Sequence, residues 1–250
     1  MLTRKLTVYL SGAQGNLGSE IAIRLESRPE VQLVKLKRDS ENSYVHALES
    51  FYENAPGGEL FLIHCGWDVS NRRIDKQEIC LEDTQKLADF CQPRGIKMVF
   101  ISSTSASNSS KSNYGKMKFR AQQSVVKAGG LVLRPGLVIF ERPKGIQKYF
   151  ELMKRSNFQV SFFPNANVTT INAEQLINEI ESCLKDDTKH GVIECLGNNP
   201  STLNALCTLP IGKSKRRLFI PLKPLSFILR LAGRLNGRIK SIDDSLRGII

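Results

Sequence analysis

Three kinds of polar side chain are spaced so that they could act on one substrate oxygen. Tyr114 and Lys118 stand four residues apart, and residues at this spacing share one face of a helix. An ammonium beside a phenol lowers the pKa of the phenol from about 10, which favours the phenolate needed to remove a proton from an alcohol. Thr104 lies ten residues before Tyr114, in a hydroxyl-rich run at residues 102–105, and such a hydroxyl can hold the same oxygen. Taken alone, the Tyr114 and Lys118 pair is more consistent with two surface side chains, and it gains meaning from the glycine turn and the hydroxyl run.

A glycine-rich turn near the N-terminus predicts a nucleotide site. Residues 6–10 form an apolar run typical of a buried parallel strand, and an amphipathic helix begins at about residue 16. Gly12 permits a tight turn, Gly15 lets the backbone approach phosphates, and Gly18 lets the helix pack closely on the strand. The start of a helix presents unpaired N–H groups and the positive end of its dipole to a pyrophosphate. The expected contacts are Gly12, Gln14, Gly15, Asn16, Leu17 and Gly18, and the alternative is an ordinary strand-to-helix turn.

The end of the second apolar run, residues 31–36, favours one dinucleotide over the other. A site for NAD usually places an acidic residue roughly 20 residues after the glycines, on the ribose hydroxyls. This chain has Lys37 and Arg38 there, and cations of this kind bind the 2′-phosphate of NADP. We therefore expect NADP, with Lys37 and Arg38 as contacts. Asp39 leaves NAD open, and a solvated charged turn is the other interpretation.

The elements that must position these residues alternate between strands and helices. Apolar runs at residues 6–10, 31–36, 60–64, 97–101 and 131–133 are separated by helical patterns, one from about residue 16 and others at about 46–53, 75–91 and 114–128. Such βαβ repetition predicts an α/β fold with a doubly wound parallel sheet of the Rossmann type. In these sheets ligands bind outside the carboxyl ends of the strands, where both the glycines and the hydroxyl cluster fall.

The last two fifths of the chain are less regular. We expect an NAD(P)-binding domain at residues 1–140 and a small, interwoven substrate-binding region at 141–250. A helix after the capping signal at residues 172–175 and a strand at 192–196 predict that residues 165–196 partly return to the first sheet. A short helix from Ser201, a strand at 218–220 and a helix from Pro224 complete the expected elements.

Composition restricts the partners and the compartment. The net charge of +12 and the pI near 9.5 indicate an anionic partner, but the basic residues do not interleave with aromatic ones as in a nucleic-acid site. The six cysteines form no CxxC pair and read as reduced and structural, and no histidine has the spacing of a metal ligand. No apolar stretch reaches the ~20 residues of a membrane span, and no leader is evident. We expect a cytoplasmic protein without metal or nucleic acid.

The C-terminal segment carries an arginine stripe. From Pro224, apolar residues recur at helical spacing while Arg230, Arg234 and Arg238 stand four apart. Such a basic amphipathic helix could make peripheral contact with anionic lipid. The alternative is a helix that buries one face on the substrate region.

With these motifs together, the sequence resembles the extended short-chain dehydrogenases, a family of nucleotide-sugar epimerases, dehydratases and reductases. The resemblance covers nearly the whole chain. Its motifs are the glycines Gly12, Gly15 and Gly18, a fourth-strand element Leu62-Ile63-His64-Cys65-Gly66, the pair Tyr114 and Lys118, and Leu133-Arg134-Pro135-Gly136-Leu137-Val138. The implied activity is hydride transfer with NAD(P) on a sugar carried by a nucleotide, as in polysaccharide biosynthesis.

The resemblance also implies roles for individual residues. Tyr114 would be the general acid or base, Lys118 would lower its pKa and hold the nicotinamide ribose, and Thr104 would fix the reacting oxygen, or Ser103 if the alignment shifts by one. His64 would brace its loop by hydrogen bonds. The family's cofactor contacts correspond to His64, Cys65, Gly66, Ser102, Tyr114, Lys118, Pro135, Gly136 and Leu137, and the candidate contacts to an anionic substrate are Trp67, Thr104, Arg142, Lys144 and Arg216. A homodimer is a further expectation.

Two departures from the family pattern leave an alternative open. The helix at residues 75–91 has no asparagine for the family's proton relay, and the residue nearest to its position is Cys80. The loop between Thr104 and Tyr114 is also short for covering a large ligand. The alternative is a regulatory or sensor protein that binds NADP without turnover.

Overall fold

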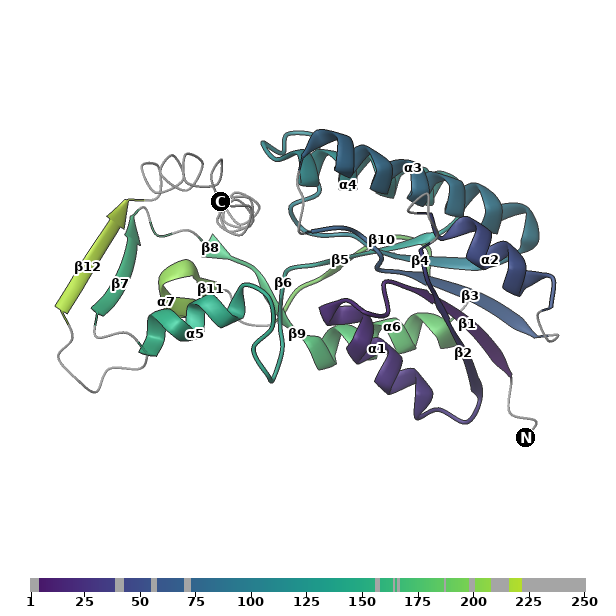
Figure 1. The fold of residues 1–250 in the computed structure, drawn as a ribbon, viewed down its shortest axis with the longest axis horizontal. Coiled ribbons are helices and arrows are strands. Elements are labelled where there is room, and N and C mark those ends of the chain that lie inside the picture. The colour runs from purple at the N-terminus through teal and green to yellow at the C-terminus, as the bar shows by residue number, and fades with distance from the viewer. Residues whose placement is uncertain are drawn as a thin grey trace. The chain divides into compact units, whose positions relative to one another are not determined.

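The computed structural model describes residues 5–38, 43–54, 58–69, 73–155, 158–163, 165, 167–186, 188–197, 201–207 and 216–221 (Figure 1). The chain divides into two compact units. The first contains Met1–Pro135 and Ala173–Cys195, and the second contains Gly136–Asn172 and Leu196–Ile250. The chain therefore leaves the first unit after Pro135, returns to it for 23 residues from Ala173, and leaves it again.

The first unit is built on a six-stranded parallel sheet, which confirms the predicted fold class. The strands are β1 (Leu6–Ser11), β2 (Val31–Leu36), β3 (Glu59–His64), β4 (Lys97–Ile101), β5 (Leu131–Pro135) and β10 (Gly191–Cys195). Their order is β10-β5-β4-β3-β1-β2, so the direction of winding reverses between β1 and β3. Sheets of this kind bind ligands at that reversal, outside the carboxyl ends of the strands.

Helices cover both faces of this sheet (Figure 1). One face carries α1 (Asn16–Glu26) and α6 (Ala173–Lys185), and the other carries α2 (Val45–Tyr52), α3 (Ile74–Cys91) and α4 (Asn113–Lys127), with a 3-10 turn η1 (Gln92–Arg94) after α3. Every residue of β1 is buried, as expected for a strand covered on both faces. On α1 the buried residues recur at helical spacing: Gly18, Ile21, Ala22 and Leu25.

An ion pair fixes the returning helix α6 to α1. The Arg28 guanidinium lies 2.8 Å from the Glu181 carboxylate through Nη2, and its Nε donates to the same oxygen at 2.9 Å. Arg24 approaches the other oxygen of Glu181 at 3.6 Å. Because Glu181 is largely buried, these charge-assisted contacts satisfy a carboxylate that would otherwise be costly to desolvate.

The second unit consists of small ladders. Its elements are β6 (Leu137–Ile139), α5 (Gln147–Arg155), β7 (Phe158–Phe163), β8 (Asn167–Val168), β9 (Thr170–Asn172), β11 (Ser201–Thr202), α7 (Leu203–Cys207) and β12 (Arg216–Pro221). β6 pairs with β9 and β7 with β12, both in parallel, and β8 pairs antiparallel with β11.

The structure corrects two sequence expectations. The helix expected from Ser201 begins at Leu203, because Ser201 and Thr202 pair with β8 and the Thr202 hydroxyl then accepts the Ala205 N–H at 3.2 Å. The element Leu62-Ile63-His64-Cys65-Gly66 lies at the end of the third strand, β3, not of a fourth strand. Among the described residues between β2 and β3 only the helix α2 forms.

Several expectations fall on residues that the structure does not describe. These include Asp39 and the whole C-terminal helix expected from Pro224. In the part of the chain that is described, no helix is both long enough and apolar enough to cross a bilayer.

Candidate active site

Three loops leave the carboxyl edge of the sheet at the same level. Ser11 pairs in register with His64, and His64 pairs with Phe100, so β1, β3 and β4 end side by side. Gly12 follows the first of these strands, Cys65 and Gly66 follow the second, and the run 102–105 follows the third. The predicted glycine turn and hydroxyl cluster therefore lie at one edge of one sheet.

The glycine turn is held by close backbone contacts that exclude larger residues. Gly12 has a φ of +74°, and a Cβ on it would lie 2.7 Å from Gly66 Cα. A Cβ on Gly18 would lie 2.1 Å from the Gly12 carbonyl oxygen, which also accepts the Gly15 N–H at 2.9 Å. The first turn of α1 carries no acidic side chain, and its N-cap residue, Gly15, has no side chain at all. The turn thus presents backbone N–H groups without a competing carboxylate, as an anion site requires.

His64 braces this turn from below. Its Nδ1 lies 2.6 Å from the Ser11 hydroxyl, and its Nε2 lies 3.0 Å from the Thr84 hydroxyl. Because Thr84 donates to the Cys80 carbonyl at 2.7 Å, it accepts from the His64 Nε2–H, and Nδ1 accepts from Ser11. Burial lowers the pKa of His64 to about 3, so the ring is neutral. With both nitrogens engaged, His64 links β1, β3 and α3 and supports the loop that carries Gly66.

The two predicted cations after β2 lie differently. Lys37 is exposed, whereas Arg38 turns back onto the loop after β3, where its Nη2 donates to the Gly66 carbonyl. The Arg38 guanidinium also lies 5.0 Å from the centre of the Tyr44 ring. A Cβ on Gly66 would collide with that ring at 2.4 Å. Arg38 therefore shapes the loop, and Lys37 is the cation that faces solvent.

Lys118 is enclosed beside Tyr114. Both residues project from the start of α4, which the Ser112 hydroxyl caps by accepting the Gly115 N–H at 3.0 Å. The Lys118 ammonium donates to the Ile101 carbonyl at the end of β4. It lies 4.8 Å from the centre of the Phe100 ring and 5.7 Å from that of Tyr114. Burial lowers the pKa of Lys118 to about 7, so the charged and neutral forms of the amine are both populated near neutral pH.

Trp67 completes the surroundings of Lys118. Its ring centre lies 4.9 Å from the ammonium and 6.4 Å from the Tyr114 ring, which it meets edge to face. The Trp67 N–H donates to Gln77 at 2.8 Å, and the Gln77 amide donates to the Asp68 carbonyl at 2.9 Å. This network fixes the indole beside the phenol and the ammonium.

The hydroxyl cluster separates into engaged and available groups. Ser103 accepts the Ser105 N–H at 3.2 Å and lies 2.9 Å from the Ser105 hydroxyl, while Ser102 is buried and donates to Gln122 at 3.3 Å. Thr104 is partly exposed, and its N–H donates to the Pro135 carbonyl at 3.0 Å. Within the described part of the chain, the Thr104 hydroxyl makes no hydrogen bond. Thr104 is thus better placed than Ser103 to hold an external oxygen.

The remaining predicted contacts belong to the second unit or lie outside the description. Gly136 and Leu137 open the second unit, where the Leu137 N–H donates to the Thr169 carbonyl at 2.8 Å. Arg142 is exposed, and the Lys144 ammonium lies 5.4 Å from the centre of the Phe140 ring. Arg216 begins β12, and its side chain is not among those described. Their contacts with cofactor or substrate stay predictions.

Sequence reasoning missed the groups that hold the predicted ones in place. Phe100 and the Ile101 carbonyl surround Lys118, Gln77 fixes Trp67, and Tyr44 packs on Gly66. Only Phe100 and Ile101 had a signal, since they end the strand that leads into the hydroxyl cluster.

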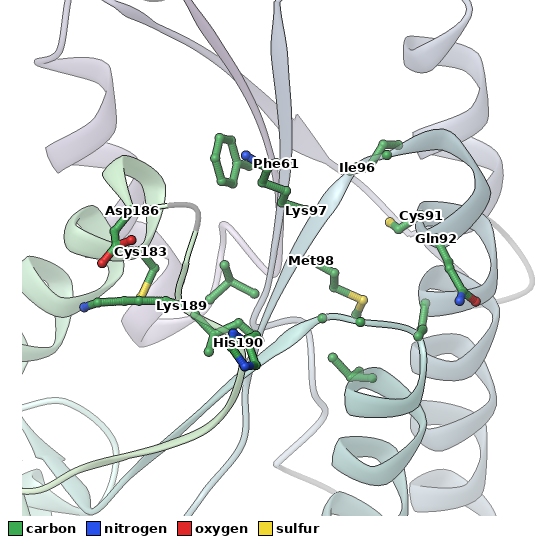
Figure 2. Close-up of a pocket in the computed structure, with 18 residues that line it drawn as sticks. Phe61, Cys91, Gln92, Ile96, Lys97, Met98, Cys183, Asp186, Lys189 and His190 are labelled. Atoms are coloured by element: carbon green, nitrogen blue, oxygen red, sulfur yellow. The ribbon is translucent and has the colours of Figure 1, made fainter.

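A cavity of about 370 Å³ lies at the opposite, amino-terminal edge of the sheet (Figure 2). Lys97, Lys189 and His190 lie at this cavity together with apolar side chains. Lys97 pairs with Glu59 at 3.4 Å and Lys189 with Glu179 at 2.7 Å, so both ammonium groups already have counter-charges. None of the predicted site residues lines it.

The fold, together with the loops at the carboxyl edge of the sheet, defines a doubly wound α/β protein with a glycine turn of the dinucleotide-binding kind. No protein-family model and no curated protein sequence matches the chain. Solved structures do. The dTDP-4-dehydrorhamnose reductase of Bacillus anthracis, solved with NADP, is 14% identical with a TM-score of 0.65 over 87% of this chain and 86% of that one.

Two epimerases are similar to the same extent. The UDP-glucuronic acid 4-epimerase of Bacillus cereus, solved with UDP-glucuronic acid and NAD, is 15% identical with a TM-score of 0.63 over 86% of each chain. The ADP-L-glycero-D-manno-heptose-6-epimerase of Helicobacter pylori is 16% identical with a TM-score of 0.64 over 88% of this chain and 86% of that one. These similarities confirm the predicted fold.

Proposed function

We propose that this chain is an NAD(P)-dependent enzyme that transfers a hydride to or from a sugar carried by a nucleotide. The observation that carries the proposal is the enclosure of Lys118 beside Tyr114, at the sheet edge where the glycine turn lies. A buried amine is costly to maintain and is common where a protein needs a proton or a charge. The similar structures solved with NADP, NADPH or NAD support the cofactor class.

The glycine turn fits a dinucleotide. Gly12 and Gly18 leave no room for a Cβ, and the N–H groups at the start of α1 face no acidic side chain of that turn. Gly12, Gln14, Gly15, Asn16, Leu17 and Gly18 would hold the pyrophosphate, with Cys65, Gly66, Ser102, Pro135, Gly136 and Leu137 along the rest of the cofactor. Lys37 would contact the 2′-phosphate, which favours NADP over NAD. The cofactor would supply the hydride acceptor or donor at its nicotinamide.

The residues of the chain would handle the proton. Tyr114 takes a proton from a substrate hydroxyl, or gives one to a carbonyl, while the Thr104 hydroxyl fixes the same oxygen. A proton on Lys118 Nζ favours the Tyr114 phenolate through its charge. The rings of Trp67 and Phe100 keep water from the ammonium, which strengthens this coupling.

The substrate would be an anion of moderate size. The net charge of +12 favours a phosphorylated ligand, and Arg142, Lys144 and Arg216 are the proposed contacts for its diphosphate. The choice among reductase, epimerase and dehydratase depends on the sugar. Peripheral membrane contact and a homodimer stay predictions.

The test uses the single tryptophan of the chain, Trp67, because it lies beside Lys118 and Tyr114. Titration with NADPH or NADH should quench Trp67 emission and excite the reduced nicotinamide by energy transfer, with NADPH binding more tightly. Tyr114→Phe should leave these affinities within about threefold but lower turnover of nucleotide sugars by about 10²- to 10⁴-fold. Tyr149→Phe, at a partly exposed tyrosine of the second unit, is the matched control.

One observation favours the second candidate, an NADP sensor without turnover. The Trp67 ring packs against Tyr114, and the phenol is only 9% exposed. A sensor should bind cofactor and show no turnover to lose in Tyr114→Phe. Absence of binding to either cofactor would reject both candidates.

A further inference from the structure

Arg134 of β5 grips the turn that carries the hydroxyl cluster. Its Nη2 donates to the carbonyl oxygens of Ala106 at 2.9 Å and of Thr104 at 3.3 Å. Its Nε donates to the Ser103 carbonyl at 3.4 Å. One guanidinium thus reaches three carbonyls of a single turn.

Glu194 fixes the other side of this guanidinium. The two residues stand opposite each other in the register of β10 and β5, and Arg134 Nη1 lies 2.6 Å from the Glu194 carboxylate. The arginine side chain is 21% exposed, so its charged hydrogen bonds are partly shielded from water. Glu194 neutralises the charge and sets the orientation of the planar group.

The other hydrogen bonds of the turn leave the Thr104 and Ala106 carbonyls to the guanidinium. The Thr104 N–H donates to the Pro135 carbonyl at 3.0 Å, the Ala106 N–H donates to the Ser103 carbonyl at 3.0 Å, and the Ser105 N–H donates to the Ser103 hydroxyl at 3.2 Å. These bonds fix the N–H groups of the turn, and Arg134 binds its carbonyl groups. A planar fork with five donors can hold several carbonyls in one geometry, and a lysine ammonium cannot reproduce that arrangement.

We propose that Arg134, oriented by Glu194, is a positioning residue that sets the Thr104 hydroxyl for the reaction. This inference rests on the proposed function, in which Thr104 holds the reacting oxygen. Arg134 acts through the turn and does not itself contact the substrate. The returning strand β10 thereby takes part in building the site, because it supplies the carboxylate.

The first experiment separates the rate from binding. Arg134→Gln should lower kcat by about 10- to 100-fold, the scale expected when a reacting group is displaced by about 1 Å. Cofactor affinity measured from Trp67 emission should stay within about twofold. Arg134→Lys should recover part of the rate, since it restores the charge without the fork. Glu194→Gln should lie between the wild type and Arg134→Gln.

Arg28→Gln is the matched control. It breaks another arginine–glutamate pair that fastens the returning segment, but one that joins the turn after α1 to α6. Arg28→Gln should lower stability without changing kcat. An equal loss of kcat in Arg28→Gln and Arg134→Gln would show that general stability sets the rate, and would overturn the proposal.

The second experiment does not depend on turnover. Amide hydrogen exchange in a peptide covering residues 103–106 should rise about tenfold or more in Arg134→Gln and stay unchanged in Arg28→Gln. Unchanged exchange in both variants would refute the inference that Arg134 holds the turn in place. Faster exchange with an unchanged kcat would overturn its role in the reaction.

If the wild type binds cofactor but turns over no nucleotide sugar, the proposed function fails and the catalytic part of this inference fails with it. The exchange result would then still decide whether Arg134 orders the turn. Should Arg134→Gln fail to fold, the same two readouts on Arg134→Lys and Glu194→Gln decide the question.

Discussion

Replacing Lys118 with methionine should stabilise the folded protein near neutral pH while removing the charge that the proposed chemistry uses. The side chain is 3% exposed, and its ammonium donates a hydrogen bond to the Ile101 carbonyl. Burial lowers the pKa of Lys118 from 10.5 to about 7, so the charged form is disfavoured on folding. Methionine has a similar shape and carries no charge.

The expected size follows from the pKa change of Lys118. At about 1.4 kcal/mol per unit, a fall from 10.5 to about 7 costs roughly 5 kcal/mol of folding free energy below pH 7, and roughly 4 kcal/mol at pH 7. Methionine removes this cost but leaves the Ile101 carbonyl without its donor, a loss of about 1–3 kcal/mol. Lys118→Met should therefore gain roughly 1–3 kcal/mol of unfolding free energy at pH 7.

The pH dependence gives the sharper test. Because the folded pKa lies below the unfolded one, the cost is fully present below about pH 7 and fades as the pH rises toward 10.5. The advantage of Lys118→Met should shrink steadily above pH 7 and vanish between about pH 8.3 and 9.8, where the remaining cost equals the loss of about 1–3 kcal/mol at the Ile101 carbonyl. Denaturant unfolding followed by circular dichroism measures it without relying on Trp67, which contacts the ammonium.

Lys116→Met is the control, since this lysine is exposed on the same helix. Its effect should stay within about 0.5 kcal/mol at every pH. A Lys118→Met protein that is less stable than the wild type at pH 7, by an amount that does not change with pH, would refute the burial argument.

Further substitutions test the glycine turn, the histidine and the hydroxyl. Gly12→Ala should destabilise by more than about 3 kcal/mol and abolish cofactor binding, whereas Gly129→Ala, with a φ of +79° but open space around it, should cost about 1–2 kcal/mol, both read from denaturant unfolding. The folded pKa of His64, about 3, lies below its unfolded value of 6.5, so stability should fall as the pH drops from about 6.5, and unfolding of His64→Gln should show a shallower fall. Thr104→Val should lower turnover by about 10-fold or more while Ser103→Ala changes it little, and the reverse order would assign the role to Ser103.

The sheet could be predicted because its strands carry their own signals. Residues 6–10 and 97–101 are mostly apolar runs bounded by turn residues, and the helix after Asn172 has a capping signal. The prediction of a helix from Ser201 was wrong, because the sequence of two residues does not reveal whether they cap a helix or pair with a strand. The pairing of β11 with β8 depends on a partner more than 30 positions away.

The sequence predicts which side chains belong to the site, but it does not predict which groups they contact. Tyr114 and Lys118 stand at helical spacing, but the partner of Lys118 is a backbone carbonyl, which every residue possesses. The choice between Thr104 and Ser103 depends on the conformation of the turn, in which the Ser103 hydroxyl is hydrogen-bonded to Ser105 and the Thr104 hydroxyl is not bonded within the described residues. The pairing of Arg134 with Glu194 follows from strand register, which the order of residues alone does not fix.

The late position of β10 has a consequence during synthesis. While the chain emerges from the ribosome, β5 is complete some 60 residues before its neighbour β10 has been made, so its outer edge has no strand to pair with. An unpaired edge of this kind invites association between nascent chains. A chain terminated at residue 172 should therefore aggregate when expressed, and adding residues 173–195 should be what restores a recoverable protein.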